Sequence, residues 1–191
     1  MFDRTYTTTK TTKRTKPIEY IVIHSTAMPT SSAKAVAKAF QNTTKDKSTH
    51  YVVDETSVYH LVDDDAEVYT WHCGAKAYRP GCSARNANSI GVDLCDRGLD
   101  GVDVNSVTDP RWYFPYSTLA NAIAVLTYLC STYHISVDNI VRHYEVTGKH
   151  CPICMTQNGR EFLLDWLKEE VRRNLGSVTR LDNALDLCCK L

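Results

Sequence analysis

"IEYIVIH", residues 18–24, decides the fold class, because this run of β-branched and aromatic side chains is apolar on both faces. A run this short does not suit a typical helix, and it does suit a central strand that is covered on both sides. Pro17 opens the run, and His24 falls at its carboxyl end. The stretch therefore predicts an internal strand that ends in a histidine.

Two later stretches have the same arrangement of a buried strand with a polar residue on it or after it. "SIGVDLC", residues 89–95, places its apolar residues on one face and Asp93 on the other. "NIVRH", residues 139–143, returns as a strand that ends at His143. An acid on a core strand needs a partner or a chemical task. Asp93 is therefore expected to have either a hydrogen-bonding partner or a chemical role.

The other segments complete an α/β pattern. Alternation predicts a hairpin of residues 49–54 and 57–63, whose turn lacks the usual glycine. Helical spacing predicts three amphipathic helices, over residues 31–42, 117–134 and 159–174. Residues 96–116 are expected to form a long loop. We expect Ser117 to cap the second helix. Strands and helices alternate without a strict βαβ rhythm, so the sequence predicts a mixed central β-sheet flanked by helices.

The chain length indicates one domain. With 191 residues, of which 43% are hydrophobic, the chain is long enough to bury a real core. We expect the domain to cover residues 17–175. Residues 1–16 are rich in Thr and Lys and predict a flexible or loosely docked basic arm, because they bury little apolar surface. Residues 176–191 are expected to form a tail.

Composition also limits the partners. The 22 basic residues balance the 22 acidic ones, so no overall field attracts nucleic acid or an anionic membrane. No apolar stretch reaches the roughly 18 to 20 residues that span a bilayer, and the first residues are polar, without a signal-peptide core. We therefore expect synthesis in the cytoplasm and no membrane insertion. The sequence does not specify an oligomeric state.

The stretch "VRHYEVTGKHCPIC", residues 141–154, has three chemical interpretations. Its C-x-x-C could be a thiol redox site, but such sites open a helix early in a βαβ unit, so this interpretation is the weaker one. A structural zinc site would need a second ligand pair, for which His72, Cys73 and Cys82 have unspecific spacing. A catalytic zinc site needs only three protein ligands and an open position, which the set His24, His143 and Cys151 would meet.

Five ordered motifs carry a family resemblance. They are "YIVIHSTA", "STHYVVD", "WHCG", "NSIGVDLC" and "RHYEVTGKHCP", and they extend over about residues 17–172. In this order they are far more specific than any one motif alone. The chain resembles the zinc-dependent N-acetylmuramoyl-L-alanine amidases of the type 2 family, which includes phage lysins and is related to the peptidoglycan recognition proteins.

The resemblance implies specific roles. It implies that His24, His143 and Cys151 bind one Zn²⁺ per chain and that Lys149 stabilises the oxyanion. Asp93 stands where many relatives have Glu and is the expected general base, with a side chain one methylene shorter. Some relatives have a catalytic Tyr near the position of Thr49, a role that we do not assign to Tyr51. Residues in the same motifs are expected to line a glycopeptide groove: His50, Trp71, His72, Asn88 and Ser89.

The implied activity is hydrolysis of the amide bond between N-acetylmuramic acid and L-alanine in peptidoglycan. A single domain of this kind suits a bacteriolytic phage-type endolysin or an autolysin, which is made in the cytoplasm and acts on the cell wall after release. Two alternatives stay open, namely a non-catalytic peptidoglycan-binding module and a thiol-dependent enzyme that uses Cys151 and Cys154. We expect Cys154 to be a buried spectator, since a third protein ligand leaves the fourth zinc position to water.

Overall fold

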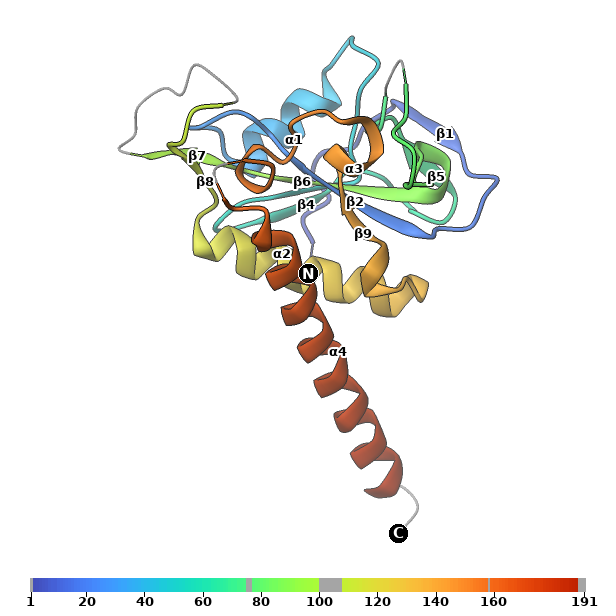
Figure 1. Ribbon diagram of the computed structural model, residues 1–191. Coiled ribbons are helices and arrows are strands. Elements are labelled where there is room, and N and C mark those ends of the chain that lie inside the picture. The colour runs from blue at the N-terminus through green and yellow to red at the C-terminus, as the bar shows by residue number, and fades with distance from the viewer. Residues whose placement is uncertain (1, 75–76, 100–107, 158, 189–191) are drawn as a thin grey trace.

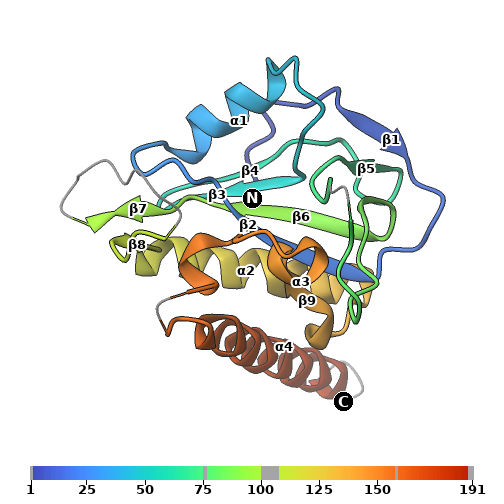
Figure 2. The same cartoon turned by 45° about the horizontal axis from the view of Figure 1, so that its top comes forward.

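A mixed five-stranded sheet forms the centre of the structure, a computed structural model that describes residues 2–74, 77–99, 108–157 and 159–188. The strand order is β4-β3-β6-β2-β9, and only β4 runs antiparallel to its neighbour. The strands are β2 (Tyr20–Ser25), β3 (Tyr51–Val53), β4 (Val58–His60), β6 (Ser89–Leu94) and β9 (Ile140–Arg142). Helices lie on both faces (Figures 1 and 2), which confirms the predicted α/β class.

The predicted central strand lies between two parallel partners. β2 pairs with β6 on one side and with β9 on the other. Ile21, Val22 and Ile23 are completely buried, so both faces of the strand are covered. This burial explains why the stretch at residues 18–24 shows no alternation of polar and apolar residues.

Two helices cover one face of the sheet. They are α2 (Tyr116–Tyr133) and α4 (Phe162–Cys188), and they pack on the alternate apolar residues of β2 and β6 in the main core. The prediction that Ser117 caps α2 was wrong, because Pro115 is the N-cap residue and no side chain caps the helix. Proline has no N–H to satisfy, and its fixed φ suits the start of a helix.

The opposite face of the sheet is only partly covered. Helix α1 (Ala33–Gln41) begins after Ser32, whose side chain accepts a hydrogen bond from the Ala35 N–H at 3.3 Å, as the sequence predicted for a serine cap. It packs on β3 and β4. The short helix α3 (His143–Thr147) follows β9 directly. Between α1 and α3, the ends of β2 and β6 face a cleft.

The β3–β4 hairpin forms as predicted, and Asp54 explains how its turn dispenses with glycine. One carboxylate oxygen of Asp54 accepts hydrogen bonds from the backbone N–H groups of Thr56 and Ser57, at 2.9 and 2.8 Å. The other accepts from the N–H of Ala33 at 2.7 Å, at the first residue of α1. A single buried acid therefore holds the turn and joins it to α1.

From residue 2 onward the N-terminal segment is docked on the domain, where the sequence predicted a flexible or loosely docked basic arm over residues 1–16. Strand β1 (Thr11–Lys13) pairs with β5 (Val68–Thr70). Arg14 is only 8% exposed and donates hydrogen bonds to the backbone carbonyls of Asp65 and Ser89, at 2.8 and 3.1 Å. Composition misled the prediction because this segment is held by the hydrogen bonds of Arg14 and β1 and by the packing of Phe2 and Tyr6 on the core.

Two further boundaries differ from prediction. In the long loop, β7 (Arg97–Gly98) pairs with β8 (Trp112–Tyr113), while residues 100–107 lie outside the described part. Helix α4 continues beyond residue 174 to Cys188 and extends away from the body of the domain (Figure 1), so the expected tail is largely helical. Glycine at 176 does not end it, since glycine costs only about 1 kcal/mol inside a helix.

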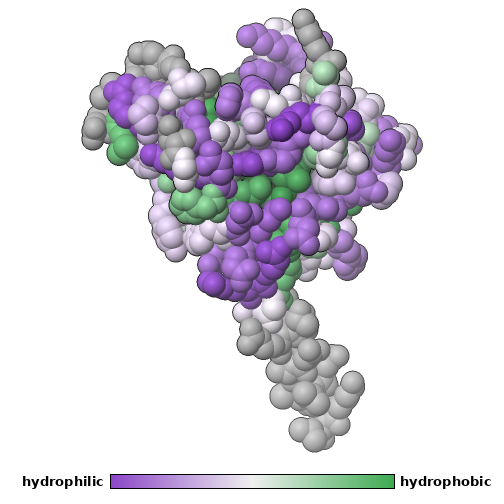
Figure 3. Space-filling model, in the orientation of Figure 1, coloured by the Kyte–Doolittle hydropathy of each residue, from purple (hydrophilic) through white to green (hydrophobic). Residues whose placement is uncertain are grey.

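The described residues also include the short 3₁₀ helices η1 (Asn86–Asn88), η3 (Val137–Asn139) and η4 (Ile153–Met155). The face seen in Figure 3 is largely hydrophilic, with hydrophobic residues gathered near its middle. Within the described residues, no helix has the length and apolar character needed to cross a membrane.

Candidate metal centre and active-site cleft

The register of the parallel strands brings the predicted chemical residues together. His24 of β2 pairs directly with Asp93 of β6, so both side chains lie on the same face of the sheet. On the other side of β2, Ile23 pairs with Arg142, and His143 follows at the first turn of α3. His24 and His143 therefore each come one residue after a directly paired position, so they lie at the same end of the two neighbouring strands.

A tight turn then returns Cys151 to the same place. Helix α3 ends at Gly148, whose left-handed conformation (φ 80°) suits glycine. The chain reverses, and the N–H of Tyr144 donates to the carbonyl of Cys151 at 2.9 Å. The N–H of Ser25 donates to the Cys151 sulfur at 3.4 Å. These contacts fix the thiol against the end of β2.

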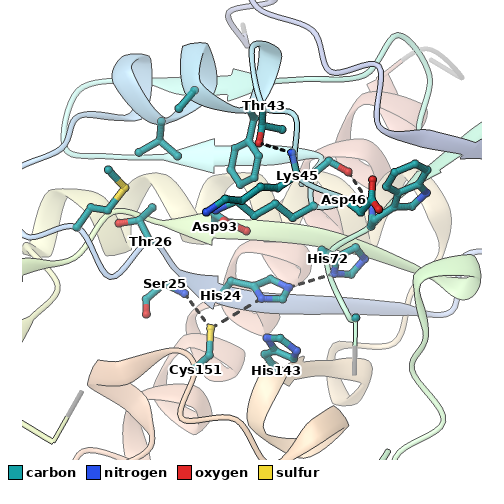
Figure 4. Close-up of a pocket in the computed structure, with 18 of the residues that line it drawn as sticks. His24, Ser25, Thr26, Thr43, Lys45, Asp46, His72, Asp93, His143 and Cys151 are labelled. Atoms are coloured by element: carbon teal, nitrogen blue, oxygen red, sulfur yellow. Dashed lines mark hydrogen bonds between the residues drawn. The ribbon is translucent and has the colours of Figure 1, made fainter. Parts of the chain in front are cut away.

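His24, His143 and Cys151 form a compact donor set (Figure 4). Each is at most 5% exposed, and their donor atoms all lie within 4.8 Å of one another. The Cys151 Sγ and His24 Nδ1 atoms are 3.8 Å apart. Zinc bond lengths of about 2.0 and 2.3 Å in a tetrahedron would separate such N and S atoms by about 3.5 Å. The spacing thus fits a zinc ion.

His143 gives an independent sign of a metal site. Both of its ring nitrogens are buried and have no hydrogen-bond partner in the described part of the chain. Buried polar atoms are rarely left in this state, and a metal ion would satisfy one of them. Together with the thiol and imidazole donors, this makes the three residues chemically suited to a zinc ion.

Burial keeps the two histidines neutral and the cysteine protonated in the metal-free protein. It lowers the pKa of His143 to about 4 and that of His24 well below the ordinary value, so both imidazoles offer lone pairs at neutral pH. Burial also raises the pKa of Cys151 to about 12, so metal binding must displace its proton. A thiol in this state is a poor nucleophile, which counts against the thiol-dependent alternative.

Cys154 is the other half of the C-x-x-C motif and lies in the main core. It is 2% exposed, and it is not among the described residues that group as possible metal ligands. Neither cysteine is in a disulfide. The structure therefore agrees with the expected spectator role of Cys154 and separates it from Cys151.

Asp93 lies on the floor of the cleft. Burial of its carboxyl group raises its pKa to about 7, while a hydrogen bond from Thr49 and the charges of Lys149 and Lys47 act in the opposite direction. A carboxyl group with this pKa can both accept and donate a proton near neutral pH. Tyr51 points away from the cleft and donates to Asp65 at 2.6 Å, consistent with our not assigning it a role.

The cleft has a volume of about 470 Å³ and a cationic rim. Lys45, Lys47 and the exposed Lys149 line it, together with the aromatic rings of Phe40 and Trp71. Sequence reasoning missed Lys45 and Lys47, which belong to the polar loop after α1. Only their place opposite the metal ligands reveals them.

The predicted groove residues divide into two groups. Trp71 and His72 line the cleft as expected, but the described cleft does not include His50, Asn88 or Ser89. These three are buried, at 0%, 7% and 0% exposure, and their role as substrate contacts stays a prediction. His50 directly precedes β3, and Asn88 and Ser89 stand at the start of β6. Their polar atoms bond to the protein; for example, His50 Nδ1 accepts from the N–H of Gly91 at 2.9 Å.

Comparison with known proteins agrees with this geometry. The family profile described as N-acetylmuramoyl-L-alanine amidase matches residues 14–154. The chain is 34% identical over 143 residues to a probable N-acetylmuramoyl-L-alanine amidase of Bacillus licheniformis, covering 71% of this chain and 36% of that protein. It is 29% identical over 136 residues to the amidase XlyA of Bacillus subtilis, covering 70% of this chain and 39% of that protein.

Among solved structures, PlyL superposes with a TM-score of 0.61 at 25% identity, covering 83% of this chain and 86% of that chain. The catalytic domain of XlyA gives a TM-score of 0.58 at 26% identity, covering 83% of this chain and 91% of that chain. The chain thus spans less than half the length of the two curated relatives, and its match covers most of each of the two solved chains.

Proposed function

The chain belongs to the N-acetylmuramoyl-L-alanine amidase family, and from this premise we propose that it is a zinc hydrolase that cleaves the bond between N-acetylmuramic acid and L-alanine in peptidoglycan. The observation that carries the proposal is the donor set of His24, His143 and Cys151 at the base of an open cleft. The unpartnered ring nitrogens of His143 support a metal at this set.

The roles of the other residues follow from their places in the cleft. Zinc, when bound, supplies a water of lowered pKa and polarises the substrate carbonyl. Asp93 accepts a proton from the attacking water and returns it to the leaving amine, for which a pKa near 7 is well suited. Lys149 places a positive charge at the rim, where it stabilises the developing oxyanion. Phe40 and Trp71 provide apolar surface against which the substrate packs.

The cationic rim also suits the proposed substrate. Lys45, Lys47 and Lys149 face the cleft, and Asp46 is paired with Lys10 at 3.7 Å. The peptide stems of peptidoglycan carry carboxylates, which such a rim attracts.

The proposal also includes the location of the protein. We propose that it is made in the cytoplasm and acts on the wall after release, as a bacteriolytic endolysin or an autolysin. Lysis of bacterial walls by protein added from outside would test this part.

Metal content and amide cleavage, measured together, test the function. Purified protein is analysed for zinc, and release of new L-alanine amino groups from peptidoglycan is followed before and after chelation. Wild type is compared with Cys151→Ser and with Cys82→Ser, a matched control at a partly buried cysteine outside the donor set. We expect about one zinc per chain in wild type and control, and loss of zinc and activity in Cys151→Ser.

The other outcomes distinguish the alternatives. Zinc without cleavage would indicate a non-catalytic peptidoglycan-binding module. Cleavage that survives chelation and stops after thiol alkylation would indicate a thiol-dependent enzyme, and the amidase mechanism given above would be wrong.

A further inference from the structure

A row of hydrogen-bonded side chains runs from the metal ligands into the protein. His24 Nε2 lies 3.0 Å from His72 Nδ1, the contact drawn between these rings in Figure 4. His72 Nε2 lies 3.2 Å from the Ser89 hydroxyl oxygen. That hydroxyl lies 2.6 Å from the backbone carbonyl of Arg85. Except for His24, none of these groups belongs to the expected zinc ligands.

The end of the row sets the direction of every bond in it. The Arg85 carbonyl can only accept, so the Ser89 hydroxyl donates its proton there. The Ser89 oxygen then accepts from the N–H at His72 Nε2. A neutral imidazole carries one N–H, so His72 Nδ1 is an acceptor and His24 Nε2 must be the donor. This leaves the lone pair of His24 on Nδ1, the atom that faces the Cys151 sulfur.

The ring of His72 is held firmly where this bond requires it. The backbone N–H groups of His72 and Cys73 both donate to the side-chain oxygen of Asn86, at 3.1 and 2.6 Å. The ring lies against Gly91 of β6, where a Cβ atom would come within 2.6 Å of the ring carbon Cγ. Glycine in a strand often marks such a close approach. His72 is therefore fixed by a backbone clamp and by the space above Gly91.

We propose that His72 is a positioning residue, which fixes the tautomer and orientation of His24 so that Nδ1 is presented to the metal. This corrects the expected role of His72 in binding substrate. Its ring borders the cleft, but both ring nitrogens are engaged within the protein. Ligand histidines in metal sites are commonly held through their second nitrogen in this way. The inference rests on the proposed zinc site and does not depend on the substrate.

One competing arrangement uses the same atoms. His24, His72 and Cys73 also have donor atoms within 4.8 Å of one another, so a metal could be held by this second set. The Cys73 sulfur lies 3.2 Å from His72 Nδ1. In the set of His24, His72 and Cys73, each residue has a hydrogen-bonding neighbour. His143, in the set with His24 and Cys151, has none among the described residues. The unsatisfied histidine favours the first set.

Zinc affinity, measured by competition with a chromophoric chelator, tests the role of His72 without reference to activity. The series is wild type, His72→Phe, His72→Asn and Ser89→Ala. Trp71→Phe is the control, since Trp71 borders the cleft and its indole N–H donates to Thr12, outside the row of hydrogen bonds. Phenylalanine keeps a ring but has no acceptor, and asparagine can place its oxygen near the former Nδ1. Folding of each variant is verified by urea unfolding in the presence of chelator.

We expect His72→Phe to weaken zinc binding about 10- to 100-fold. His72→Asn should recover most of this loss, Ser89→Ala should lose less than His72→Phe, and Trp71→Phe should bind as wild type does. Wild-type affinity in folded His72→Phe would overturn the proposal, and so would equal losses in the Phe and Asn variants. If the wild type binds no zinc, the proposed function itself is wrong and this inference with it.

Cobalt substitution separates the two metal sets. Thiolate-bound Co²⁺ gives a charge-transfer absorption band, which we expect to persist in Cys73→Ser and to vanish in Cys151→Ser. The reverse pattern would place the metal at His24, His72 and Cys73, and the bond between the two histidines would then not be a positioning contact.

Discussion

Gly91→Ala should disturb the metal site without changing any ligand. A Cβ atom at position 91 would lie 2.6 Å from Cγ, 2.8 Å from Nδ1 and 3.0 Å from Cβ of His72. Carbon atoms in contact ordinarily lie about 3.5 to 4.0 Å apart, so the overlap is about 1 Å. Strand β6 is held on both sides by β2 and β3 and cannot move easily. The His72 ring must therefore shift.

Two magnitudes follow from this shift. Overpacking in a core costs about 1 to 3 kcal/mol, and alanine recovers about 0.4 to 1 kcal/mol through the entropy of the unfolded chain, so the net loss of stability should be about 1 to 2 kcal/mol. A ring displaced by about 1 Å would stretch the 3.0 Å bond between His72 and His24 beyond hydrogen-bonding distance. Zinc affinity should fall about tenfold or more.

The assays are urea unfolding of the metal-free protein and zinc competition. Gly74→Ala is the matched control for stability, because a Cβ atom there would meet nothing within 4 Å. The cost of Gly91→Ala should also shrink in a His72→Ala background, since the clashing ring is then gone. If Gly91→Ala binds zinc and unfolds as the wild type does, or costs the same in both backgrounds, the steric argument is refuted.

Three further predictions concern Asp93, Lys149 and Arg14. Because burial raises the pKa of Asp93 to about 7, the folded metal-free protein holds a proton that the unfolded chain releases, and its stability falls as pH rises from about 4 to 7. In urea unfolding, the free energy of unfolding of Asp93→Asn relative to wild type should therefore increase between about pH 4 and 7 and stay constant above pH 7. A difference that does not change with pH would contradict the raised pKa. Lys149→Met should lower kcat by about 10² to 10³ and leave zinc affinity unchanged, so that a parallel loss of zinc would exclude an oxyanion role. Arg14→Ala should destabilise the fold by about 3 kcal/mol in urea, because it leaves buried carbonyls without donors, whereas the exposed Lys16→Ala should stay within about 0.5 kcal/mol.

The strands and the positions of two candidate metal ligands at strand ends were predictable because each depends on a strong local signal. The apolar run at 18–24 has no good alternative to a central strand, and its terminal histidine could only fall at the sheet's carboxyl end. The register then brings His24 beside Asp93, as the alternation of residues 89–95 indicated. Motif order supplied the remaining ligands, which no spacing rule would have joined over such a distance.

The direction in which motif side chains point, and the hydrogen bonds that dock the N-terminal segment, were not predictable in the same way. Trp71 and Ser89 belong to equally specific motifs, yet one borders the cleft and the other is fully buried. A motif records that a residue matters and does not record which way its side chain points. The docking of Arg14 depends on backbone carbonyls that only the folded chain brings together. Gly91 did carry a signal, since a glycine within an apolar strand often marks a close contact.

The parallel pairing of β2 has a consequence for how the chain folds. Both neighbours of this strand lie far downstream in the sequence, and His24 is separated from Cys151 by 127 residues. Closing a loop of that length costs about 4 kcal/mol of chain entropy, and parallel pairings of this kind fold slowly. The three candidate ligands meet only after the sheet has closed, so zinc bound at the proposed site would come too late to speed folding. Its effect should instead fall on the unfolding rate, prolonging the lifetime of the finished molecule.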